Sequence, residues 1–150
     1  MINSTMAGTF DAALKWDPSA QWFETVLRAG FFHKIISILT HHSYRLIDLN
    51  NYPMQKRYGH YAGQREVPLD QIRGTEGRSN DFDDRFHPLT DRTRQRWMSV
   101  ARANEQGLSL PPVDLIQVGD VYFVRDGHHR ISVARAFGQT TITARVTIQG

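Results

Sequence analysis

The run over residues 121–138 constrains the fold most, because it changes from a strand pattern to a helix pattern at one dipeptide. Four apolar residues of strand type open the run, and Asp126-Gly127 then turns the chain. Apolar residues recur at helical spacing after this turn, and Gly138 is typical of a helix end. We therefore predict an α+β fold, in which a small mixed sheet carries packed helices.

Other segments of the C-terminal half fit the same domain. The apolar runs at 113–118 and 121–124 flank a Gly-Asp pair, which is typical of a β-hairpin. Thr90-Asp91 is typical of a helix start, and Gly107 of a helix end, so a helix is predicted between them. The remaining predictions are strands at 66–72 and 140–148 and a polar loop at 75–89.

The first 62 residues are predicted to form a separate region. Asp17-Pro18 is typical of a helix start, with Asp as the capping residue and Pro at the first helical position. Apolar residues then recur near helical spacing to about residue 40, and Gly30 is a point at which this helix could divide. The stretch at 44–61 has no clear pattern and is interpreted as a connector. The predicted organisation is a disordered leader at 1–9, an N-terminal helical extension at 10–62 and a folded domain at 63–150.

Composition excludes some chemistry and favours one class of ligand. The chain has no Cys, which rules out thiolate catalysis, disulfides and Cys-based metal sites. It also lacks an apolar run of membrane-spanning length and the order of a signal peptide, so a cytoplasmic protein with no membrane partner is expected. Fifteen of the eighteen basic residues are Arg, whose planar fork suits phosphate or carboxylate. A GC-rich genome explains the same excess equally well.

The turn at Asp126-Gly127 is also the candidate site. A helix start leaves backbone N–H groups without intrahelical acceptors and carries the positive end of the helix dipole, so a glycine turn into a helix favours an anion. Arg130 in the first turn opposes that dipole unless an anion is bound or a carboxylate, Asp126 or Asp120, pairs with it. The alternative for the dipeptide is an ordinary capping turn.

The order of these elements, with the motif Asp126-Gly127-His128-His129-Arg130, resembles the ParB/sulfiredoxin superfamily. The resemblance covers roughly residues 65–148, and it includes a first strand near residues 67–72 with Arg78 in the loop that follows. It implies a ParB/sulfiredoxin-like fold that binds the phosphates of ATP, ADP or CTP, with Mg²⁺, at the helix start. The residues carried over as phosphate contacts are Arg78, Gly127, His128, His129 and Arg130.

The match to individual members of the superfamily is uneven. Sulfiredoxins have Cys where this chain has His128, so sulfinate reduction is not expected. The Asp-Gly-His-His-Arg form is closer to the free serine kinases, in which His and Arg contact phosphate. Partitioning ParB proteins have Gly-Glu-Arg-Arg, followed by a helix-turn-helix domain that we do not expect here. No catalytic residue is assigned, and the candidates are Asp126, His128 and His129.

The polar loop supplies candidate metal ligands. Mg²⁺ beside nucleotide phosphates is usually held by one or two carboxylates, and Asp81, Asp83 or Asp84 could provide them. The alternative, slightly favoured for these three residues, is a solvated loop in which acidic and basic side chains pair with each other.

Two functional classes remain open. The first is a nucleotide-binding protein that acts as a nucleotide hydrolase or a small-molecule phosphotransferase. The alternative is a non-enzymatic DNA-associated or regulatory module, which is less favoured. The basic strip that would serve it is weak and consists of Arg92, Arg94, Arg96 and Arg102. The many Phe, Trp and Ile residues before residue 40 exceed what a small sheet needs, so a homodimer through the N-terminal helices is also expected.

Overall fold

The computed structural model describes residues 17–52, 58–77 and 80–150. The predicted leader at 1–9 lies outside the described residues, and so does Arg78. The α-helices are α2 (Pro18–Leu39), α3 (Arg94–Glu105) and α4 (His128–Ala136), and the strands are β1 (Ile47–Asp48), β2 (His60–Pro68), β3 (Ile72–Thr75), β4 (Val113–Val118), β5 (Val121–Asp126) and β6 (Thr141–Gln149). Short 3₁₀ turns cover Leu49–Asn51, Leu69–Gln71 and Asp91–Thr93.

Within the described residues, these strands form one six-stranded mixed sheet in the order β1-β3-β5-β4-β6-β2. Strand β5 runs parallel to β3 and antiparallel to β4, and β6 runs parallel to β4 and antiparallel to β2. The predicted hairpin is confirmed, since β4 and β5 pair on either side of Gly119-Asp120. The α+β class with a mixed sheet and an N-terminal helix is likewise confirmed.

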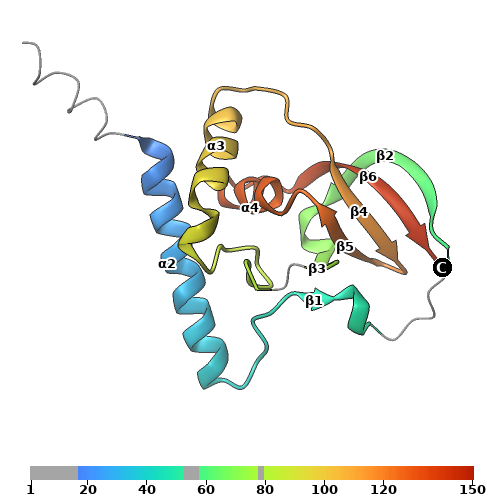
Figure 1. Cartoon of the computed structure of the whole chain (residues 1–150), viewed down its shortest axis with the longest axis horizontal. Helices are drawn as coiled ribbons and strands as arrows, with labels where there is room; N and C mark the ends of the chain where they lie inside the picture. Colours follow the sequence, from blue (N-terminus) through green and yellow to red (C-terminus); the bar gives the residue numbers. More distant parts are fainter. Residues whose placement is uncertain (1–16, 53–57, 78–79) are drawn as a thin grey trace, which may run out of the picture.

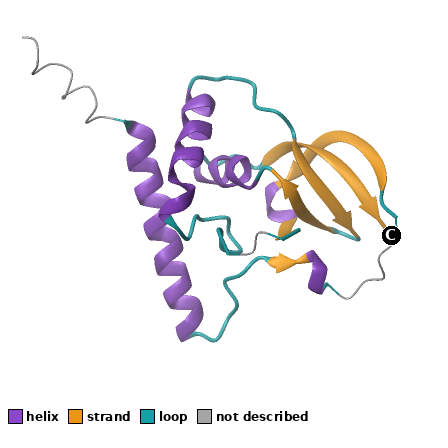
Figure 2. Ribbon diagram, viewed as in Figure 1, coloured by secondary structure: helices purple, strands orange, loops and turns teal. Residues whose placement is uncertain are grey.

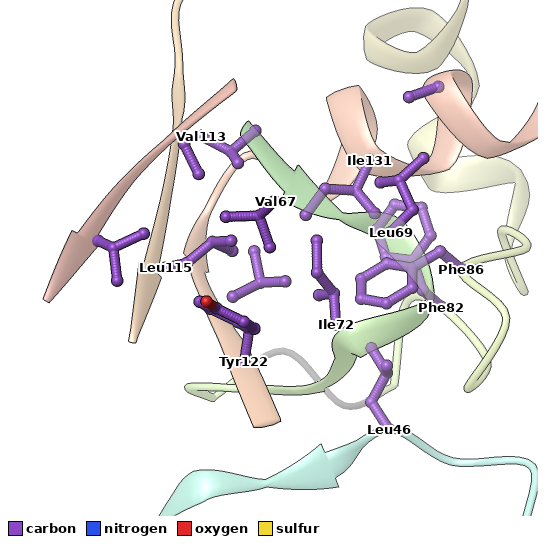
Figure 3. Packing of buried hydrophobic residues seen from close by; sticks show 14 residues of the cluster. Leu46, Val67, Leu69, Ile72, Phe82, Phe86, Val113, Leu115, Tyr122 and Ile131 are labelled. Carbon is purple, nitrogen blue, oxygen red and sulfur yellow. The ribbon is translucent and has the colours of Figure 1, made fainter. Parts of the chain in front are cut away.

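The helices gather on one side of the sheet, with α4 nearest to it, α3 beside α4 and α2 outermost (Figures 1 and 2). The main core lies between the sheet and α4 and includes Val67, Val113, Leu115 and Ile131 (Figure 3). A second cluster joins the three helices around Trp97, which is fully buried and donates a hydrogen bond to Ser132. Helix α2 is therefore held to the domain by packing on α3 and α4.

The strand predicted at 66–72 is wrong in its boundaries. Strand β2 begins earlier and pairs with β6, whereas β3 begins at Ile72 and pairs with β1 and β5. A 3₁₀ turn separates them, and the amide of Leu69 donates to the carbonyl of Thr140. The 3₁₀ turn redirects the chain after Pro68. Val67 therefore lies in β2 at one edge of the sheet, whereas Ile72 lies in β3 near the other edge.

Two expectations about the N-terminal region also need correction. The predicted connector at 44–61 contains β1, which pairs with β3, and Leu46 just before it is part of the main core. A two-residue strand is too short to give a periodic pattern. Helix α2 is continuous through Gly30, where a Cβ would lie 2.9 Å from the carbonyl oxygen of Pro88. This glycine allows a loop to approach the helix closely.

Helix α2 begins at Pro18 with Asp17 as its capping residue, as the sequence predicts. The Asp17 carboxylate accepts the amide of Ser19 at 3.0 Å, and Pro18 occupies the first turn. Arg102 of α3 pairs with the same carboxylate, and these hydrogen bonds from Arg102 and Ser19 lower the pKa of Asp17. None of the described helices combines the length and apolar character needed to cross a membrane.

Candidate functional site

Gly127 forms the junction between β5 and α4. Its φ of 107° is left-handed, and it is the N-terminal cap of α4. A Cβ at this position would lie 2.4 Å from a methyl group of Val113 in β4. Both the backbone angle and the close packing therefore require glycine here. The first turn of α4 is thus fixed against the sheet.

His128 anchors this helix start in the protein interior. Its side chain is buried, and Nε2 lies 2.7 Å from the hydroxyl of Thr75 at the end of β3. Its ring stacks on Phe82, with the centroids 6.0 Å apart. The imidazole of His128 therefore connects the helix start to β3 and to the loop after β3.

His129, the next residue in the first turn of α4, is half-buried. It meets Phe82 edge-on, with the ring centroids 5.3 Å apart. Thr75 and Phe82, which both contact His128, flank the segment 76–81 in the sequence. The structure thus brings the end of β3 and Phe82 beside the start of α4. Arg78 belongs to this segment but lies outside the described residues.

The guanidinium of Arg130 contacts two backbone carbonyls and one carboxylate. It donates to the carbonyls of Pro111 and Pro112 at 2.6 and 2.8 Å, and it forms an ion pair with Asp126. The carboxylate of Asp126 therefore offsets the charge that Arg130 brings to the positive end of the helix. This is the carboxylate pairing left open by the sequence. Arg130 also lines a small cavity of about 200 Å³ beside α4.

The three candidate Mg²⁺ ligands fall in different environments. Asp81 forms an ion pair with Arg92 of the following helical turn. Asp83 is fully buried, and Asp84 lies next to it with one buried oxygen. The described partners of Asp83 are two histidines and the loop backbone, not the start of α4.

Those two histidines are His33 of α2 and His87 of the loop, which the sequence did not single out. Their Nδ1 atoms lie 3.0 and 2.9 Å from the same oxygen of Asp83. Burial acts to raise the pKa of Asp83, but the hydrogen bonds and charge of His87, with those of the backbone and His33, lower it overall. The four-residue spacing of Asp83 and His87 was visible in the sequence, whereas His33 is fifty residues away from Asp83.

The arginines of the predicted basic strip are largely paired with carboxylates. Arg94 of α3 contacts Glu24 and Asp91, and these hydrogen bonds raise its pKa despite some burial. Arg102 pairs with Asp17, as described above. Three of the four arginines of this strip, Arg92, Arg94 and Arg102, are therefore paired with carboxylates of the same chain.

Comparison with known proteins assigns neither a family nor a function to this chain. No protein-family model matches the chain, and none of the curated proteins matches it either. Among solved structures, the chain is similar to sulfiredoxin from Arabidopsis thaliana at 24% sequence identity and a TM-score of 0.41. The similar region covers 55% of this chain and 82% of that sulfiredoxin.

Proposed function

We propose that this protein binds the phosphates of a nucleotide at the start of α4. The observation that carries the proposal is the left-handed glycine turn at Gly127, packed against Val113, which joins β5 directly to the helix. Such a turn directs first-turn N–H groups and the positive end of the helix dipole at one point, which favours an anion. The residues that would contact phosphate are Arg78, Gly127, His128, His129 and Arg130.

The charges around the turn suit a phosphate accompanied by Mg²⁺. The Asp126 carboxylate is largely exposed, and it pairs with the partly buried guanidinium of Arg130. A phosphate that approaches Arg130 would meet this carboxylate, and a divalent cation bound by both would remove the repulsion. Asp126 is thus the metal-positioning candidate in this proposal, in place of Asp83, whose described contacts lie elsewhere.

The reaction that follows binding is a hydrolysis or a transfer of a phosphoryl group. Asp126 and His129 are the candidate groups for it, because both are at least partly accessible beside the turn. His128 is buried, and its role in the proposal is to hold the turn in place through Thr75. ATP, ADP and CTP are the candidate ligands.

The test is a thermal-shift series with ATP, ADP, CTP and GTP, each with and without Mg²⁺. A nucleotide at 100 times its Kd adds ~2.7 kcal/mol to the free energy of unfolding, which corresponds to a rise in Tm of roughly 5–10 °C. The rise should shrink in His129→Ala and persist in His60→Ala, which removes an exposed histidine of β2. If no nucleotide, phosphate or pyrophosphate raises Tm at millimolar concentration, the proposal is wrong.

A further inference from the structure

Three side chains from distant parts of the chain meet beside α2. His33 comes from the middle of this helix, and Asp83 and His87 come from the loop between β3 and α3. One ligand atom from each, two imidazole nitrogens and one carboxylate oxygen, lies within 4.8 Å of the other two. The glycine at position 30, one turn before His33, makes this meeting possible, because its missing Cβ leaves room for His87 and Pro88.

The loop is shaped around the buried carboxylate of Asp83. One oxygen accepts the backbone amides of Arg85 and His87 at 3.0 and 2.8 Å. The other oxygen receives the two imidazoles. A buried carboxylate is costly unless its oxygens are satisfied. The same contacts that satisfy Asp83 therefore fix both the orientation of the carboxylate and the positions of the histidines.

The distances between the polar atoms suit a shared metal ion. Two ligands that are each bonded at ~2.1 Å to one tetrahedral ion stand ~3.4 Å apart, so a cluster held at hydrogen-bond distances can take up an ion with an outward shift of only a few tenths of an ångström. The two imidazole nitrogens stand 3.0 and 2.9 Å from the Asp83 oxygen. Imidazole nitrogen with carboxylate oxygen is the donor set of Zn²⁺ and related transition metals, whereas Mg²⁺ and Ca²⁺ take oxygen ligands.

Asp84 supplies a second, independent observation. Its Oδ1 atom is buried, has no hydrogen-bond partner among the described residues, and lies 3.5 Å from the ring nitrogen of His33. If protons alone bridged the histidines to Asp83, this neighbouring carboxylate oxygen would keep only its long ionic contact with His33. A divalent cation would satisfy it, and the two carboxylates would balance the charge of the ion.

We propose that His33, Asp83 and His87, with Asp84 as the fourth ligand, form a binding site for a divalent transition-metal ion of the Zn²⁺ class. Each imidazole binds the ion through Nδ1 and keeps its proton on Nε2. An ion reaches the site from a cavity of about 860 Å³ that Asp84 and His87 line together with Arg85. The bound ion joins α2 to the loop that precedes α3, so its role is that of a clamp. This site is separate from the proposed phosphate site.

The test is metal binding by the full chain, free of any histidine tag and stripped with EDTA. Zn²⁺ measured by calorimetry should bind at one ion per chain, and Co²⁺ should give visible absorption bands. Zn²⁺ should also raise Tm and slow hydrogen exchange in α2. His33→Gln and His87→Gln should each weaken Zn²⁺ binding at least 100-fold, a larger change than the 10–100-fold typical of residues that only support a ligand.

The matched control is His60→Gln, which removes an exposed histidine from β2 and should bind Zn²⁺ as the unmodified chain does. Circular dichroism establishes that each variant is folded. If one histidine variant does not fold, the other still decides, because either loss removes a ligand. Absence of stoichiometric binding, or equal affinity in His87→Gln and His60→Gln, would overturn the proposal.

Discussion

The start of α4 and the His33–Asp83–His87 cluster are built in opposite ways. The first arises from consecutive residues, since β5, the turn at Gly127 and the helix follow one another along the chain. The second exists only because α2 packs near a loop fifty residues away. Phe82 and Asp83 connect the two, as Phe82 contacts His128 while the next residue contacts His33. Adjacent side chains thus contact residues of the two proposed sites.

The largest expected effect concerns the local site. Gly127→Ala should lower the free energy of unfolding by about 3 kcal/mol, because ~1–2 kcal/mol of left-handed strain adds to ~1–3 kcal/mol of overpacking against Val113. Urea unfolding followed by circular dichroism measures this. Gly138→Ala is the matched control, since its φ is 72° but a Cβ there meets nothing within 4 Å. It should lose only the strain component, and equal losses would refute the packing argument.

The long-range cluster should be nearly as sensitive. Asp83→Ala, measured in EDTA, should lose about 2–3 kcal/mol, because hydrogen bonds to a charged group are worth ~1.5–3 kcal/mol and this carboxylate holds both the loop and two histidines. Asp81→Ala removes a neighbouring carboxylate whose ion pair with Arg92 is exposed on the arginine side. That variant should lose at most ~1 kcal/mol. A similar loss in both would mean that the buried cluster adds no more stability than the exposed ion pair of Asp81.

Arg130→Ala should have a double effect, on stability and on ligand affinity. Loss of the contacts to Pro111, Pro112 and Asp126 should lower the free energy of unfolding by about 1–2 kcal/mol. If phosphate binds there, nucleotide affinity should also fall by ~1.5–3 kcal/mol. Arg125→Ala, which breaks a pair with Glu76 whose arginine is more exposed than Arg130, should change stability by less than ~1 kcal/mol. Reduced stability with unchanged nucleotide affinity would make Arg130 a purely structural residue.

The smallest effect on stability is expected at the outer face of α2. Phe31, Phe32, Ile36 and Leu39 are each more than half exposed there, and the homodimer predicted from the sequence would bury them. Phe32→Glu should leave the free energy of unfolding within ~0.5 kcal/mol at low protein concentration. Sedimentation velocity should show dimers for the original chain and monomers for this variant. Monomers in both samples would rule out the dimer.

The sequence predicts the parts of the fold that depend on neighbours in the chain. The β4–β5 hairpin, α3 and α4 appear near their expected positions, because turn chemistry and apolar spacing act locally. The break between β2 and β3 and the pairing of β1 depend on hydrogen bonds to remote strands. The turn at Gly127 and a carboxylate partner for Arg130 follow from the motif, but the contacts of Arg130 with the carbonyls of Pro111 and Pro112 do not. His33 was missed because nothing near it in the sequence marks its distant partners.

The two strands at the ends of the sheet have a consequence for self-association. An exposed sheet edge offers unpaired backbone groups to other chains, and natural proteins protect such edges by shortness, charge or irregular geometry. Strand β1 has only two residues, and β2 carries Arg65 and Glu66 with a register shift between Tyr61 and Gln64. Neither edge is a good template for an added strand. This arrangement protects the protein against fibril-like growth even while α2 exposes apolar side chains.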